Sequence, residues 1–557
     1  MFLTIYPVVC QQIVVVILFV ACNNFPMAYK TQKRTVLITT SGIGTKLGEL
    51  TTYTNKALVK VGKKPALSYI IESYPKNTRF VITLGHFGEH IREFISLAYP
   101  ELSVTFVPVR VYTGKGSSLV HSMLSASKYL QQPFIYHAAD TIVYQRIPEP
   151  TKNWAGGYTS DNTSQYASFD VVDGTIQVFH EKGNMNPDYV HIGLVGVHDF
   201  ASFWKGVRHL KKQFPNNEGL SDVDVLQHML ENNVQFTPKI FDPWYDVGNV
   251  DSLQVARQSI HDSFHILDKP SESIYLFDRS VVKFFSDEKI AADRVKRAKA
   301  LGKLVPSIES ATKHFYRYKY ANGELLASVI TPATFPNFLD WAFDHMWKKE
   351  HEVSQEKFRS TCYEFYYTKT IQRTSEFLKT RNIKDSASSI NGQEVPSLSK
   401  LLKMVDFTWL ADAKQTSFHG DFIPDNIIKT SKGYTLLDWR QNFGGLLRGG
   451  DMYYDISKLN HNLVINHDII NNNHFTIERK GNVVTCDIFR SQRLVECQEV
   501  LKRYLLIRGL DMKKLEVLTP ILWLNMSPLH SHPYDLFLFY FGKFQLWKAL
   551  TKELPTN

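Results

Sequence analysis

Cysteine is scarce in this chain of 557 residues, and the few copies are far apart. The five cysteines are Cys10, Cys22, Cys362, Cys486 and Cys497, and no two of them form a CxxC pair. An odd number of cysteines without paired spacing predicts neither a disulfide framework nor a zinc site. We therefore expect a protein of a reducing compartment.

The chain also lacks a dense run of basic residues. Its 64 Lys and Arg against 54 Asp and Glu give a formal net charge of +10, but they are dispersed, and no zinc pattern or RNP-like run accompanies them. Because nucleic-acid-binding modules carry such features, we expect no nucleic-acid partner. The positive charge is explained equally well by attraction of anionic nucleotides and phosphorylated substrates and by a basic surface without function.

Internal repeats and low-complexity tracts are absent as well. A chain of 557 residues is too long for one core, so two or three domains are expected. With 44% hydrophobic and 21% charged residues, the composition is typical of a globular protein with a full core. The expected boundary lies between Ser259 and Ser273, and it separates residues 30–262 from residues 263–557.

Charge is missing altogether from residues 1–29, and Lys30, Lys33 and Arg34 follow them. An apolar run of this length nearly spans a bilayer, and basic residues after it would keep the rest of the chain in the cytosol. A secretory signal carries its charges before the apolar run, so secretion is the least expected outcome. Two interpretations stay open, a membrane anchor or a translation start at Met27, and both predict cytoplasmic catalytic domains.

A glycine-rich turn follows the first strand-like run, TVLITTSGIGTKLGELTTYTNKALVKVGKKP, which starts at Thr35. A dinucleotide-binding GxGxxG does not fit, because Leu47 stands at the third glycine position. Glycines let backbone N–H groups approach a triphosphate closely, and a nearby lysine neutralises the charge that builds as the α-phosphate is attacked. The pattern therefore favours phosphate chemistry over dinucleotide binding.

This segment resembles the opening of the nucleotidyltransferases that activate sugar 1-phosphates and phosphocholine, GxGTRLxxLT followed by PKxLxxVxxKP. The resemblance implies that Lys46 and Lys56 are catalytic. It implies nucleotide-binding roles for Gly42, Gly44 and Thr45. Two positions depart from the family, because Lys46 replaces an arginine and Asn55 replaces a proline. A lysine keeps the charge but loses the planar fork that binds phosphate through two hydrogen bonds.

Later segments of the first half resemble the same family in the same order. Asp140, in PFIYHAAD, and Asp246, in WYDVGN, have the places of its two Mg²⁺ ligands. The resemblance implies further nucleotide-binding residues in VYTGKGSSL, which are Gly114, Gly116 and Ser117. It implies acceptor-binding residues after residue 180, which are Glu181, Lys182 and Gly193. Together these segments imply an α/β, Rossmann-like nucleotidyltransferase domain with a mixed sheet over residues 30–262.

A second chemical pattern lies between His419 and Asp455, HGDFIPDNIIKTSKGYTLLDWRQNFGGLLRGGDMYYD. An Asp, an Asn five residues later and a second Asp after an apolar run supply one base and two hard oxygen ligands. We expect Asp421 to orient and deprotonate a hydroxyl group. We expect Asn426 and Asp438 to bind the Mg²⁺ that bridges the ATP phosphates.

The pattern resembles the aminoglycoside phosphotransferase and choline kinase family, with HGDxxxxN, LDW and GDxxYD. Because HGD and DWR replace the HRD and DFG of protein kinases, a small-molecule acceptor is expected. The resemblance implies a two-lobed, protein-kinase-like domain over residues 263–557, with Lys283 binding the nucleotide phosphates. Glu288 and Glu309 are both candidates for the acidic partner of Lys283. The polar stretch 381–399 is expected to be a loop.

Together the two resemblances predict a bifunctional transferase that uses Mg²⁺, ATP and a second NTP. One half would phosphorylate a small alcohol or sugar, and the other would couple the phosphorylated acceptor to an NMP, giving a nucleotide-activated sugar or polyol for glycan synthesis. Two alternatives stay open: a choline- or ethanolamine-type kinase with a CTP:phosphocholine-type cytidylyltransferase, and a nucleotide-binding scaffold without catalysis. The expected partners are nucleotides, a small acceptor and, through residues 1–29, a membrane.

Overall fold

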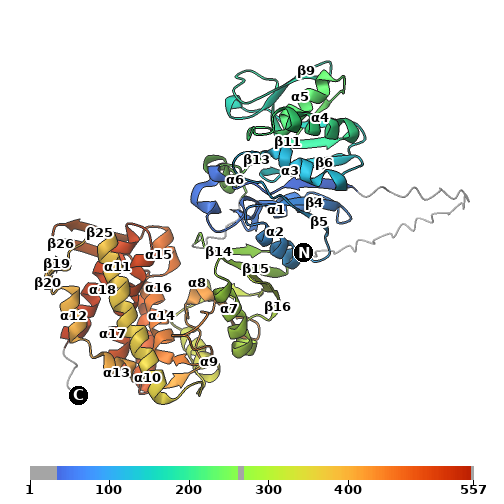
Figure 1. The fold of residues 1–557 in the computed structure, drawn as a ribbon. Helices are drawn as coiled ribbons and strands as arrows, with labels where there is room; N and C mark the ends of the chain where they lie inside the picture. Colours follow the sequence, from blue (N-terminus) through green and yellow to red (C-terminus); the bar gives the residue numbers. More distant parts are fainter. Residues whose placement is uncertain (1–33, 261–268, 553–557) are drawn as a thin grey trace, which may run out of the picture.

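The computed structural model describes residues 34–260 and 269–552. The proposed anchor or alternative start in residues 1–29 and the expected boundary after residue 262 lie outside this part of the chain. Within it, no helix is both long and apolar enough to cross a membrane. Figure 1 shows an α/β domain, a small sheet with one helix, and a mostly helical part, in this order along the chain.

The first domain is built on a nine-stranded mixed sheet, as the sequence predicted. Its central strands run parallel, in the order β6-β1-β4-β5, and β11 runs antiparallel to β6. The nine strands are β1 (Thr35–Thr39), β4 (Arg79–Leu84), β5 (Ser103–Pro108), β6 (Phe134–Ala138), β8 (Trp154–Tyr158), β9 (Ser168–Val172), β10 (Thr175–His180), β11 (Tyr189–Val197) and β12 (Thr237–Ile240). Strands buried on both faces need apolar side chains throughout, which explains the continuous apolar run of β1.

Helices cover both faces of this sheet. Side chains alternate along a strand, so Val36 and Ile38 of β1 enter one core while Leu37 enters the other. The first core also holds side chains of α1 (Ala66–Glu72) and α2 (Gly88–Ala98). The second core is closed by α3 (Leu119–Ala126), α4 (Phe200–Gln213) and α5 (Asp222–Glu231), and α6 (Val250–Ser259) ends the domain.

A four-stranded antiparallel sheet follows, with the order β14-β15-β17-β16, and we call it the small sheet. Its elements are β14 (Glu272–Leu276), β15 (Ser280–Phe285), α7 (Glu288–Leu301), β16 (Ile308–Ala311) and β17 (Phe315–Lys319). Phe285 and Tyr316 belong to the hydrophobic core that the small sheet shares with α7 and the helical part. Phe284 and Phe315, which point the other way, belong to a core of the first domain. The small sheet therefore joins the two halves of the chain.

Polar contacts reinforce this junction. The Tyr275 hydroxyl donates to the carbonyl of Leu58 at 2.8 Å, and the ring packs edge-on against Phe94 of α2. The Glu93 carboxylate accepts from Thr312 Oγ1 at 2.7 Å and from the backbone N–H of His314 at 2.9 Å. The first domain and the small sheet are therefore packed as one body (Figure 1).

The helical part covers residues 321–552. Its helices are α8 (Leu326–Val329), α9 (Phe335–His345), α10 (Gln355–Tyr363), α11 (Lys369–Thr380), α12 (Leu398–Met404), α13 (Phe407–Ala411), α14 (Met452–Val464), α15 (His467–Asn471), α16 (Gln492–Ile507), α17 (Met512–Met526) and α18 (Tyr534–Thr551). One π-helical turn, η6 (Glu364–Thr368), lies between α10 and α11. The hairpin β22 (Ile427–Thr430) and β23 (Gly433–Leu436) follows the HGD segment. The long helices α17 and α18 pack side by side at the centre of this part (Figure 1).

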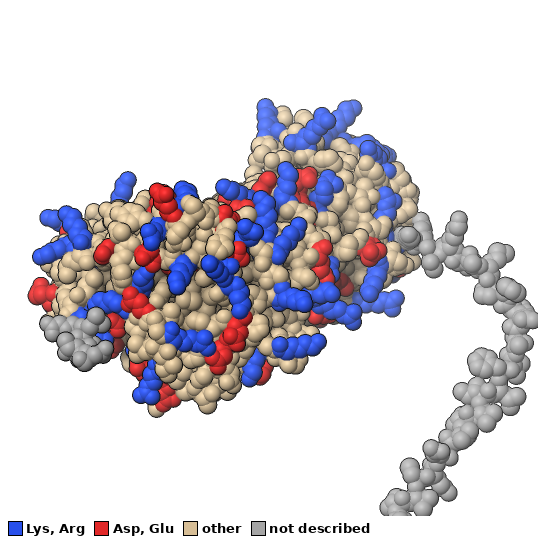
Figure 2. Space-filling view, turned by 90° about the horizontal axis from the view of Figure 1, so that it is seen from below, with Lys and Arg blue, Asp and Glu red and all other residues tan. Residues whose placement is uncertain are grey.

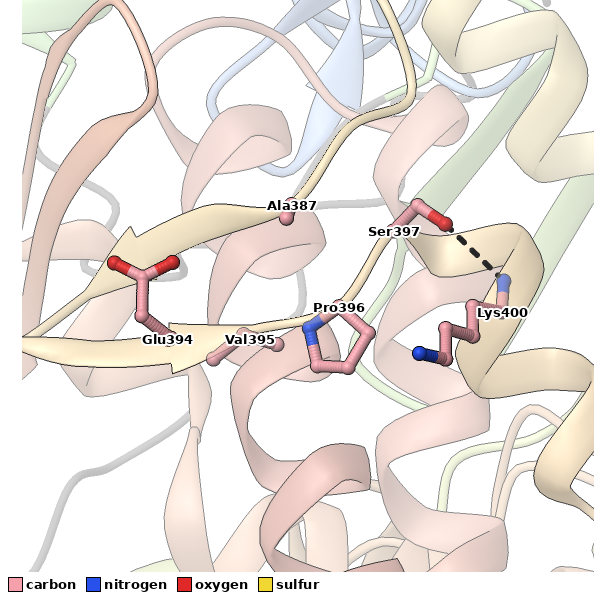
Figure 3. A pocket seen from close by; sticks show the side chains of 6 residues that line it. All are labelled: Ala387, Glu394, Val395, Pro396, Ser397 and Lys400. Carbon is pink, nitrogen blue, oxygen red and sulfur yellow. Dashed lines mark hydrogen bonds between the residues drawn. The ribbon is translucent and has the colours of Figure 1, made fainter.

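The expected loop 381–399 contains a β-hairpin instead, β19 (Ser388–Ile390) and β20 (Gln393–Val395). It forms because β19 pairs with β26 (Val483–Ile488), which comes from a distant part of the sequence. Figure 3 shows the pocket of about 340 Å³ beside this hairpin, where Ser397 caps α12 by accepting from the Lys400 N–H at 3.3 Å. None of the residues that line this pocket was predicted as a site residue.

The burial of Tyr275 at this junction leads to a prediction about stability. Tyr275→Ala removes a fully buried ring between the two halves, so we expect a loss of about 3–5 kcal/mol. Thermal unfolding should also change from one transition to two, because the halves lose their shared core. Tyr275→Phe keeps the ring and loses only the hydrogen bond, so it should cost about 1 kcal/mol. A single unshifted transition for Tyr275→Ala, measured by calorimetry, would contradict this account of the junction.

Candidate active sites

The structure brings the two predicted metal-binding aspartates of the first domain together. Asp140 follows β6, and Asp246 ends β13 (Trp244–Asp246), which pairs antiparallel with β7 (Thr141–Val143). The backbone N–H of Val247 donates to the Asp140 carbonyl at 2.9 Å. Lys56 reaches the same place, with its Nζ 3.0 Å from Asp140 Oδ2. One predicted lysine and two predicted carboxylates therefore form a single cluster.

The surroundings of this cluster shift the pKa values of its two carboxyl groups in opposite directions. Burial alone would raise the pKa of Asp140, but the Lys56 ammonium outweighs it and holds that pKa below its usual value. Burial and the neighbouring Asp140 charge raise the pKa of Asp246. Loss of solvent and the nearby Lys46 ammonium lower the pKa of Lys182. The predicted catalytic and acceptor-side lysines thus face the same aspartates.

The aspartate pair fits a magnesium ion. A Cβ placed on Gly248 would lie 3.0 Å from Asp246 Oδ1 and 3.3 Å from Asp140 Oδ2, so glycine keeps the space between the carboxylates open. No group of three or more His, Cys, Asp or Glu in the described ranges could hold a metal. Mg²⁺ commonly binds through one or two carboxylates together with substrate phosphates, so two are enough.

The glycine-rich turn positions Lys56. Gly44 has a φ of 77°, and a Cβ on it would lie 2.8 Å from Lys56 Cβ. Asn55, which stands at the proline position of the motif that the chain resembles, is fully buried, and its side chain donates to the carbonyls of Thr40 at 2.8 Å and His86 at 2.6 Å. This departure therefore fixes the turn by hydrogen bonds, a role that the motif comparison did not reveal.

Among the other predicted residues of the first domain, Gly193 packs against Ala138, two residues before Asp140. Gly114 and Gly116 have φ values of 69° and 90°, and Ser117 closes their turn by donating to the Gly114 carbonyl at 2.7 Å. Gly193 leaves no room for a side chain, since a Cβ would lie 2.7 Å from Ala138 Cβ. Gly42 and Thr45 flank Gly44 in the turn, whereas Glu181 is exposed after β10.

Two residues that the motifs did not single out bind Asp246. The Tyr166 hydroxyl donates to Asp246 Oδ2 at 3.3 Å, and the Asn249 side chain donates to the same oxygen at 3.2 Å. Asn249 also caps α6 by accepting from the Ser252 N–H at 3.0 Å. Asn249 could have been noticed in the sequence as a helix cap after WYDVG, but nothing near Tyr166 pointed to the site.

In the second half, the predicted residues also meet, between the small sheet and the helical part. The Asn426 side chain donates to Asp421 Oδ2 at 3.0 Å. Lys283 of β15 lies with its Nζ 2.7 Å from Asp438 Oδ1. Lys458 of α14, which was not predicted, is paired with Asp421 Oδ1 at 2.8 Å. The predicted base, the two predicted oxygen ligands and the buried lysine thus come from three separate segments, and Lys458 comes from a fourth.

Neither predicted acidic partner contacts Lys283. Glu288 begins α7 and lies 3.7 Å from His314 Nε2, and Glu309 pairs with Arg317 at 2.9 Å. The buried face of α7 instead presents Arg294, which forms an ion pair with Asp438. The two cations together hold the pKa of Asp438 far below its usual value, against the effect of burial. The structure therefore pairs neither of the two candidate glutamates with Lys283.

Asp455 anchors the loop that carries the predicted base. Its fully buried carboxylate accepts from the backbone N–H groups of His419 and Gly420, both at 2.7 Å, and from Trp347 Nε1 at 3.1 Å. Burial raises the pKa of Asp455 to about 6. The last aspartate of the GDxxYD pattern is therefore a positioning residue for the HGD segment.

The first domain combines a mixed α/β sheet with a lysine and aspartate cluster, and the N-terminal part of the chain is similar in sequence to nucleotidyltransferases. The low-salt glycan biosynthesis nucleotidyltransferase Agl11 of Haloferax volcanii is 23% identical over 239 residues, 40% of this chain and 65% of that protein. A glucose-1-phosphate thymidylyltransferase of Streptomyces antibioticus is 25% identical over 243 residues, 41% of this chain and 66% of that protein. The chain thus spans slightly less than two thirds of the length of these relatives. No family model matches it.

The chain also aligns with solved structures. The CTP:phosphocholine cytidylyltransferase of Streptococcus pneumoniae aligns with a TM-score of 0.36 and 16% identity, over 41% of this chain and 100% of that one. The inositol-1-phosphate CTP transferase of T. maritima aligns with a TM-score of 0.33 and 16% identity, over 40% of this chain and 94% of that one.

The backbone conformation of Gly44 leads to a prediction about stability. Gly44→Ala forces a side chain into a left-handed backbone beside Lys56, so we expect a loss of about 1–3 kcal/mol of stability. Gly42→Ala is the matched control, because its Cβ would meet nothing within 4 Å. Urea unfolding of both variants measures the difference. Equal stability of the two variants would show that Gly44 is not required by the backbone.

The raised pKa of Asp455 leads to a prediction about how the stability of the fold depends on pH. Because its folded-state pKa of about 6 exceeds the unfolded value near 4, the folded state binds this proton more tightly. The resulting stabilisation is complete below about pH 4 and is lost as the pH rises through 6, a change of about 3 kcal/mol. Asp455→Asn should remove this decline in urea unfolding between pH 4 and 7. Asp406→Asn, an exposed helix cap, should keep it. Parallel pH profiles for Asp455→Asn and wild type would refute the assignment.

Proposed function

We propose that the first domain transfers an NMP from an NTP to a phosphorylated sugar or polyol and releases pyrophosphate. The meeting of Lys56, Asp140 and Asp246 beside the glycine-rich turn carries this proposal. The names of the two relatives, one a glycan biosynthesis nucleotidyltransferase, favour an activated sugar for glycan synthesis as the product.

In this reaction an oxygen of the acceptor phosphate bonds to the α-phosphorus, and the bond from that phosphorus to pyrophosphate breaks. Backbone N–H groups of the turn around Gly44 would approach the triphosphate. Lys46, Lys56 and Lys182 neutralise the charge that accumulates on the phosphates. Asp140 and Asp246 would hold Mg²⁺, which supplies further neutralisation and orientation of the phosphates when bound.

We further propose that the second half is a two-lobed, protein-kinase-like phosphotransferase that uses ATP and acts on the hydroxyl of a small acceptor. Asp421 orients that hydroxyl and accepts its proton, and the Asn426 contact holds the Asp421 carboxylate in place. Lys283 binds the nucleotide phosphates. Asn426 and Asp438 would hold Mg²⁺, and the strongly lowered pKa of Asp438 keeps its carboxylate ionised and suited to a hard cation.

A second candidate function has one specific observation in its favour. Lys283 is paired with Asp438, which Arg294 also contacts, and no ion pair joins Lys283 to Glu288 or Glu309. In this alternative the second half binds nucleotide as a scaffold and does not transfer phosphate, while the first domain remains active. The acceptor would then have to arrive already phosphorylated.

One experiment separates these functions. The full chain is incubated with Mg²⁺, each NTP and a pool of sugars, polyols and amino alcohols, with and without their phosphates, and products are identified by mass spectrometry. We expect Asp140→Asn to reduce nucleotide transfer, and Asp421→Asn to reduce acceptor phosphorylation, each by at least about a hundredfold. Asp173→Asn, an exposed turn residue, is the control.

The outcomes have distinct meanings. Nucleotide-linked product from an unphosphorylated acceptor supports both halves of the proposal. Conversion of phosphorylated acceptors alone, unchanged by Asp421→Asn, selects the scaffold for the second half. Nucleotide transfer by Asp140→Asn at the wild-type rate would contradict the assignment of the first site.

A further inference from the structure

Four cationic side chains gather in the helical part, and one of them, Lys458, is paired with Asp421. Lys369 and Arg373 lie one turn apart at the start of α11, Arg440 follows the Asp438 segment, and Lys458 lies on α14. Figure 2, in contrast, shows basic side chains of the visible face spread out, with acidic ones among them. A local concentration of positive charge in a partly enclosed site therefore needs an explanation.

The contacts of the four groups hold them close together. Lys369 Nζ lies 3.9 Å from the centre of the Phe365 ring, and Arg440 Cζ lies 5.4 Å from the same centre. Arg440 Nη1 donates to the Tyr454 hydroxyl at 3.1 Å. Arg373 Nη1 donates to a backbone carbonyl of α17 at 3.0 Å. The π-helical turn η6 contains Phe365 and ends directly before Lys369, and such turns are frequent at functional sites.

The positive charge of this group is not balanced by the protein. Asp421 pairs with Lys458, and Glu376 attracts Arg373. Lys369 makes no ion pair or hydrogen bond within the described ranges, and the buried Nε of Arg440 has no hydrogen-bond partner there. Burial and repulsion by Arg440, Arg373 and Lys458 lower the pKa of Lys369 to about 5.

A cluster of cations without paired anions lowers the stability of the fold unless an anionic ligand binds to it. Buried cations normally have paired anions, because desolvation without a partner is unfavourable. Guanidinium and ammonium groups that converge from separate elements match the oxygens of a carboxylate or phosphate. The group is linked to Asp421, where the proposed reaction places the acceptor hydroxyl, through Lys458, which pairs with Asp421 and whose charge acts on Lys369.

We infer that Lys369, Arg373 and Arg440 bind an anionic group, a carboxylate or a phosphate, on the acceptor of the second half. This inference rests on the phosphotransferase function proposed above and specifies its substrate class. The acceptor hydroxyl oxygen bonds to the γ-phosphorus of ATP, the bond to ADP breaks, and Asp421 takes the hydroxyl proton. The acceptor is then an acidic or phosphorylated sugar or polyol, because the same charges repel a cationic amino alcohol such as choline.

Calorimetric titration of the full chain tests the inference with three probes: inorganic phosphate, glucuronate and neutral glucose. We expect at least one anion to bind. At pH 7 its binding should take up a proton, seen as a buffer-dependent enthalpy, because Lys369 is neutral until the anion arrives. The two anions distinguish a phosphate from a carboxylate as the recognised group.

The variant Lys369→Met should weaken binding of that anion at least about tenfold and abolish the proton uptake. Its melting temperature should not fall, because Lys369 makes no ion pair or hydrogen bond within the described ranges that the variant would lose. Lys379→Met, which removes an exposed lysine of the same helix, should bind like wild type. Anion binding unchanged in Lys369→Met, or no binding of either anion by wild type, overturns the inference. Binding lost in Lys369→Met while no acceptor is ever phosphorylated would confirm the anion site and remove the phosphotransferase function instead.

Discussion

The packing of the small sheet against α2 is the contact on which the arrangement of the whole chain depends. One face of the sheet completes a core of the first domain, and the other supports α7 and the helical part. Lys283 lies on this shared sheet, so the position of one site is tied to the fold that carries the other. Since such cores are close-packed, the small sheet is held in a fixed position against the first domain.

Much of the first domain could be predicted from the sequence, because its signals are local. Continuous apolar runs specified buried strands, and the glycine turn, Lys56, Asp140 and Asp246 were found at their motif positions and do meet. The sequence did not predict the contacts that hold these residues in place. Asn55 was noted only as a departure, and the hydrogen bond of Tyr166 to Asp246 depends on strands that are distant in sequence.

The second half was predicted less completely, and the misses have a common physical cause. The loop expected over 381–399 became a hairpin through pairing with β26, and the partner of Lys283 depends on which face of α7 is buried. Both are tertiary effects that override local propensity. The cationic group around Lys369 was invisible for the same reason, since its members come from α11, α14 and the segment after Asp438.

The double ion pair at Asp438 has a consequence for the charge balance of the second half. Lys283 and Arg294 together bring two positive charges to this carboxylate, the same number as a divalent cation. Replacing these two side chains by a divalent cation would therefore leave the net charge around Asp438 unchanged. The carboxylate is thus kept in its ionised form, which is the form that the proposed Mg²⁺ site requires.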